Sequence, residues 1–153
     1  MAARRPIALT TAVVLFAEAV GIVLLHSVLA AVLEGQHMSL AGLDPEMMIT
    51  GTWVLGGVSG AYLALCGAAL AVVGLRDRAP GRWLRILLVS CAITHGVLGA
   101  VVVGLVGWTA FAVLMVVLGL VVLSLIMYGP ERHEPAGEAA ETAEGPAGEP
   151  RPV

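Results

Sequence analysis

Four apolar stretches, each about as long as a membrane-spanning helix, dominate this chain of 153 residues. They cover approximately residues 7–33, 51–75, 84–106 and 110–128. A bilayer core needs about 20 apolar helical residues to cross it. Only 12% of the residues are charged, about half the share that soluble domains carry. We therefore expect an all-α membrane protein, with four transmembrane helices forming an up-down-up-down bundle over residues 1–128.

Arginines indicate how this domain is oriented in the membrane. They lie before the first span and in the second connection, whereas the first and third connections contain none. The residues are Arg4, Arg5, Arg76, Arg78, Arg82 and Arg85. Because basic connections stay in the cytoplasm, both termini are expected there, in a multi-pass protein of the bacterial plasma membrane. The first span is too long for a cleaved signal sequence, so we expect it to be retained.

Two local patterns predict where helices start, and a third predicts where folded structure ends. Asp44 can cap a helix whose first position is Pro45, and Thr109 is a candidate cap for the last span. Residues 129–153 form an acidic segment rich in proline, glycine, alanine and glutamate, with no aromatic residue. Such a segment cannot bury enough apolar surface to fold, so we expect a disordered tail.

Small residues at four-residue spacing mark the expected packing faces of the second and third spans. They let two helix backbones approach closely, which favours helix association in lipid. The residues are Gly56, Gly60 and Ala64 in the second span, and Gly96, Ala100 and Gly104 in the third.

Three hydrogen-bonding side chains are expected at one depth in the membrane. Counted from the cytoplasmic ends of their spans, Glu18 and His95 lie roughly 17 Å deep and Tyr62 roughly 20 Å deep. A carboxylate at this depth costs about 2.5–3.5 kcal/mol. We therefore expect a polar network of Glu18, Tyr62 and His95 near the midplane of the bilayer.

The chemistry of this network has three interpretations. A carboxylate in a low dielectric resists ionisation and a buried imidazole resists protonation, so one shared proton could satisfy both groups. The network could be a static contact that fixes which helices meet. It could instead be a proton-titrating or ion-binding site, or Glu18 could face another subunit.

Motifs for catalysis or cofactor binding are not found. The chain has no phosphate-binding glycine loop and no zinc-ligand spacing such as CxxC or HExxH. His26 lies about 12 Å farther out than His95, so the two are not expected to ligate a haem. We expect no metal, no cofactor and no enzymatic activity.

Residues 5–129 resemble small four-span integral membrane proteins of unassigned function from actinobacteria. The resemblance is carried by the stretches RPIALTTAVVLFAEAVG, MSLAGLDPEMM and RDRAPGRWLRILL, and it implies no substrate or site. We expect an accessory or assembly component in the lipid bilayer, as a homo-oligomer or within a larger membrane complex, without a nucleic-acid partner. The alternative is a small proton-linked transporter or channel that uses Glu18, Tyr62 and His95.

Overall fold

The computed structural model describes residues 4–36 and 44–129, and these residues form four helices. The helices are α1 (Arg4–Gln36), α2 (Pro45–Arg76), α3 (Arg82–Leu105) and α4 (Trp108–Met127). Each of them is long and apolar enough to cross a membrane. The expected all-helical fold, with four helices that could each span a membrane, is therefore confirmed. The expected disordered tail lies outside the described residues from position 130 onwards.

The helix ends show which local predictions hold. Asp44 caps α2, because its side chain accepts a hydrogen bond of 2.9 Å from the backbone N–H of Glu46. Thr109 was expected to cap the last helix, and this prediction is wrong. Gly107 occupies the cap position of α4 with φ 113°, a conformation that favours glycine. The tight turn between α3 and α4 therefore ends at Gly107, and Thr109 already lies inside α4.

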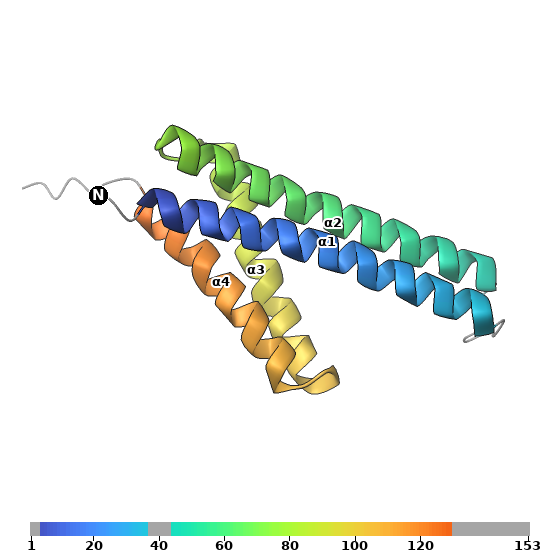
Figure 1. The fold of residues 1–153 in the computed structure, drawn as a ribbon. Helices are drawn as coiled ribbons and strands as arrows, with labels where there is room; N and C mark the ends of the chain where they lie inside the picture. Colours follow the sequence, from blue (N-terminus) through green and yellow to red (C-terminus); the bar gives the residue numbers. More distant parts are fainter. Residues whose placement is uncertain (1–3, 37–43, 130–153) are drawn as a thin grey trace, which may run out of the picture.

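Helices α1 and α2 form a long antiparallel hairpin, and glycines of α2 make its closest contacts (Figure 1). Added Cβ atoms at four glycines of α2 would lie within 3.2 Å of α1. As the glycine number rises, the number of its α1 partner falls, which is the register of an antiparallel pair. The pairs are Gly56 with His26, Gly60 with Val23, Gly67 with Ala12 and Gly74 with Ala8.

The small residues expected to form the packing face of the third span do not make its close helix contact. Nothing lies within 4 Å of an added Cβ at Gly96 or Gly104, and Ala100 is exposed. The close approach of α3 to α4 is made by Gly99, where an added Cβ would lie 2.5 Å from the Met115 side chain. Helix α3 therefore packs through a glycine outside the four-residue pattern.

The α3–α4 hairpin meets the α1–α2 hairpin at one end and diverges from it towards the other (Figure 1). A core of buried side chains from all four helices lies on the joined side, including Leu15, Leu70, Leu88 and Val121. At the joined end itself, Asp77 connects three chain segments. Its carboxylate lies 3.2 Å from the Arg5 guanidinium and accepts a hydrogen bond of 3.3 Å from the Tyr128 hydroxyl.

A buried hydroxyl pair also fixes α4 against α1. Thr11 and Ser124 have relative exposures of 0% and 1%, and their hydroxyl oxygens lie 3.2 Å apart. Each hydroxyl also lies 2.8 Å from the carbonyl oxygen four residues before it in its own helix. One hydroxyl can therefore donate to the other while the second donates to its own helix. The sequence contains one signal for this pair, because Ser124 is a polar residue in a strongly apolar helix.

Thr11→Val should lower the free energy of unfolding by less than about 1 kcal/mol, because hydrogen bonds between membrane helices contribute about 0.6 kcal/mol on average. Ser124 keeps its bond to Leu120, so no buried hydroxyl is left without a partner. Reversible unfolding in mixed micelles would measure the loss, with Thr10→Val at the exposed neighbouring threonine as the control. A loss above about 2 kcal/mol would contradict the expected magnitude.

Candidate functional site

A cleft lies between the two hairpins, beyond the joined core. Its volume is about 570 Å³, and side chains of all four helices line it. Most of the lining is apolar, and α4 contributes only Leu114. Six polar side chains also reach it: Glu18, His26, Ser59, Tyr62, Thr94 and His95. A largely apolar cavity of this size with a few convergent polar groups is typical of a small-molecule site.

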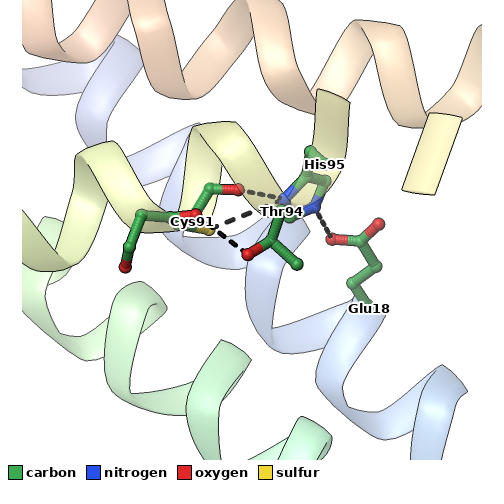
Figure 2. A network of polar contacts seen from close by, with 5 residues as sticks. Glu18, Cys91, Thr94 and His95 are labelled. Carbon is green, nitrogen blue, oxygen red and sulfur yellow. Dashed lines mark hydrogen bonds and ion pairs between the residues drawn. The ribbon is translucent and has the colours of Figure 1, made fainter. Parts of the chain in front are cut away.

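Glu18 and His95 form the contact at the centre of this polar set (Figure 2). Glu18 lies on α1 and His95 on α3, and the Glu18 Oε2 atom lies 3.0 Å from the His95 Nε2 atom. The His95 side chain is 3% exposed and the Glu18 side chain 23% exposed. The imidazole is therefore enclosed, whereas the carboxyl group remains accessible from the cleft.

The protonation of this pair follows from the second ring nitrogen of His95. Its Nδ1 atom lies 2.8 Å from the backbone carbonyl oxygen of Cys91, and a carbonyl only accepts hydrogen bonds. Nδ1 therefore carries a hydrogen. The contact between Nε2 and Oε2 then needs one further hydrogen, which belongs either to the carboxyl group or to the ring. In both arrangements the pair holds one shared proton and has no net charge.

Tyr62 lines the same cleft but makes a different contact. Its hydroxyl lies 2.8 Å from the Ser90 hydroxyl, which donates to the Leu87 carbonyl at 2.8 Å. Thr94 donates to the Ser90 carbonyl at 2.9 Å. Of the three residues expected to form one network, Glu18 and His95 contact each other. Tyr62 of α2 instead contacts Ser90, which lies on α3 like His95.

His26 lies at another part of the cleft. Its Nδ1 atom lies 2.8 Å from the Ile22 carbonyl, so Nδ1 donates and the other ring nitrogen can face the cleft. The Gly56 backbone contacts the His26 side chain from α2. His26 therefore lines the same cleft as Glu18 and His95, although the depth count predicts that it lies farther out in the membrane.

Metal-binding chemistry has no support among residues 4–36 and 44–129. No group of three or more histidine, cysteine, aspartate or glutamate side chains in these segments could hold a metal ion. Cys66 and Cys91 are both buried and free. The Cys91 Sγ atom lies 3.6 Å from the His95 Nδ1 atom, which already donates to the closer carbonyl oxygen.

The chain was compared with protein families, curated proteins and solved structures. None of the three comparisons gives a match. The cleft and the Glu18–His95 pair are therefore the features of the molecule that bear on its function.

Proposed function

We propose that this protein is a non-enzymatic, multi-pass component of a bacterial plasma membrane, with both termini in the cytoplasm. The six arginines of the described residues support the orientation, since they lie at the start of α1, at the end of α2, in the turn that follows and in the first turn of α3. These helix ends are on the side where the hairpins join (Figure 1). In this orientation the hairpins diverge towards the outer leaflet. The cleft between them then lies within the hydrocarbon region, beside the Glu18–His95 pair.

We infer that this cleft is the functional site of the protein and that it binds a small lipophilic molecule. The observation that carries the proposal is the combination of apolar walls with one accessible carboxyl group, Glu18, at the side of an enclosed histidine. Apolar walls provide affinity for a molecule that partitions into lipid, and the pair orients its polar end. The few other polar side chains offer no catalytic constellation, which favours an accessory role over catalysis.

Gly21→Leu is expected to abolish ligand binding, because Gly21 lines the cleft and has open space where a side chain would begin. The leucine can therefore fill the cleft without displacing a neighbour. Wild-type protein purified in mild detergent should carry a small lipophilic molecule that is detected by native mass spectrometry and by absorbance of the solvent extract. Gly57→Leu is the matched control, since Gly57 is exposed, has equally open space and does not line the cleft.

Equal amounts of bound molecule in the Gly21→Leu and Gly57→Leu proteins would contradict binding in the cleft. A wild-type protein that carries no molecule and takes up none of the probes described below would contradict it as well.

The second candidate function is proton-linked transport. It is favoured by a specific observation, the single shared proton of a pair whose carboxyl group is accessible from the cleft. This function requires Glu18→Gln to abolish a pH-dependent flux in liposomes while the protein still folds.

A further inference from the structure

The Glu18–His95 pair presents a hydrogen-bond acceptor to the cleft. The Glu18 Oε2 atom is occupied by His95, and the second carboxyl oxygen points away from the ring (Figure 2). Within the described residues this second oxygen makes no hydrogen bond to the protein. Both nitrogens of His95 are engaged by Cys91 and Glu18. A ligand that meets the pair from the cleft therefore gains most if it donates hydrogen bonds.

The charge of the pair narrows the class of donor. With its shared proton the pair is neutral, and without that proton it carries one negative charge. Most of the cleft wall is apolar, so a net charge on the occupied site would be costly. A neutral donor leaves the proton in place, whereas a cation balances the charge that remains when the proton leaves. Both kinds of donor keep the site neutral, but only a cationic donor forms charge-assisted hydrogen bonds to the Glu18 carboxylate, which are roughly twice as strong as neutral ones.

We propose that the cleft binds a lipophilic primary amine as its ammonium ion, in exchange for the shared proton of Glu18 and His95. The inference rests on the proposed binding function and names its ligand class. One ammonium ion enters, one proton leaves to water, and no covalent bond other than the N–H or O–H bond of that proton is broken. The ammonium group donates to the Glu18 carboxylate and to Nε2 of His95, two acceptors that would otherwise face each other at 3.0 Å. Nδ1–H of His95 remains on the Cys91 carbonyl.

Other titratable groups face the pair from the surrounding helices. His26 lies on α1, Tyr62 and Cys66 lie on α2, and Cys91 lies on α3. Within the described residues α4 contributes the apolar Leu114 to the cleft and no titratable group. Tyr62 also hydrogen-bonds across a helix contact, but its partner is the Ser90 hydroxyl. Glu18 and His95 are the carboxyl and imidazole groups that share a hydrogen across a helix contact within the described residues. The exchanged proton is therefore assigned to this pair.

The experiment compares 4-phenylbutylamine with 4-phenylbutanol, which has the same apolar body and a neutral donor. Binding to the protein in lipid nanodiscs is measured by calorimetry in two buffers of different ionisation enthalpy, which gives the number of protons released. Empty nanodiscs and the Gly21→Leu protein correct for partition into lipid. The amine should release about one proton per molecule bound, and its affinity should rise about tenfold per pH unit while the free pair holds its proton. The alcohol should bind without proton release.

Each result supports or overturns the inference. Amine binding without proton release, or binding of the alcohol alone, would overturn the exchange while leaving the cleft as a lipophilic binding site. If neither probe binds the wild type more strongly than it binds the Gly21→Leu protein, the proposed binding function itself is overturned. Glu18→Gln should bind the amine at least tenfold more weakly than the wild type does and should release no proton, because the glutamine amide carries no exchangeable acidic proton. If this variant folds poorly, the number of protons that the wild type releases per amine bound still tests the exchange.

Discussion

Gly56→Leu is expected to separate α1 from α2 and to lower the free energy of unfolding by about 3 kcal/mol, the upper part of the range for overpacking. An added Cβ at Gly56 would lie 2.5 Å from the Cβ and 2.8 Å from the Cγ of His26. A Cβ atom is fixed to the backbone, so it cannot rotate away. Relief therefore requires α1 to move. At Gly60 the nearest atom is a methyl group of Val23, which can rotate, so Gly60→Ala should be milder.

Gly57→Leu provides the matched control for Gly56→Leu. The two glycines are adjacent in α2, so the gain in helix propensity from replacing glycine is the same for both. Nothing lies within 4 Å of an added Cβ at Gly57, and the change should stay within about 0.5 kcal/mol of the wild type. Reversible unfolding in mixed micelles would measure both variants. Similar losses at the two positions would show that the α1–α2 contact does not depend on the glycine face.

The sequence predicts the helices well because length and hydropathy are properties of one segment at a time. Its prediction of the packing faces is less complete. Gly56 and Gly60 do contact α1, but the same face continues through Gly67 and Gly74 at seven-residue spacing. Seven residues are about two helical turns, which keeps contacts on one face along a long helix pair. A search for four-residue spacing alone finds Gly56 and Gly60 but neither Gly67 nor Gly74.

The site shows what depth can predict and what it cannot. Counting residues from the helix ends places Glu18 and His95 at one level, because the rise per residue is constant. The same count places Tyr62 there, yet its hydroxyl bonds to Ser90. Which neighbour a side chain meets depends on helix rotation and on the angle between hairpins, and hydropathy specifies neither. The cleft is lined by all four helices, so no single segment of sequence predicts it.

Glu18→Gln should fold with a stability within about 1 kcal/mol of the wild type, whereas Glu18→Leu should lose about 1–3 kcal/mol. The reason lies in His95. Its Nδ1 atom donates to the Cys91 carbonyl, so Nε2 of the neutral ring can accept a hydrogen bond from a glutamine amide. Leucine offers no donor and leaves Nε2 of an enclosed imidazole without a partner, which costs its full desolvation penalty.

The double variant Glu18→Leu/His95→Leu separates the desolvation penalty of the unpaired His95 nitrogen from the general effect of adding apolar surface. Replacing both partners by apolar groups removes the unpaired nitrogen, so the double variant should be more stable than the sum of the two single changes implies. Reversible unfolding of the four proteins in one lipid mixture would give the coupling energy. Equal stability of Glu18→Leu and Glu18→Gln would show that the contact contributes nothing to the fold. Glutamine can replace the hydrogen bond of Glu18 but cannot release a proton, so Glu18→Gln also separates the structural part of the contact from its proton.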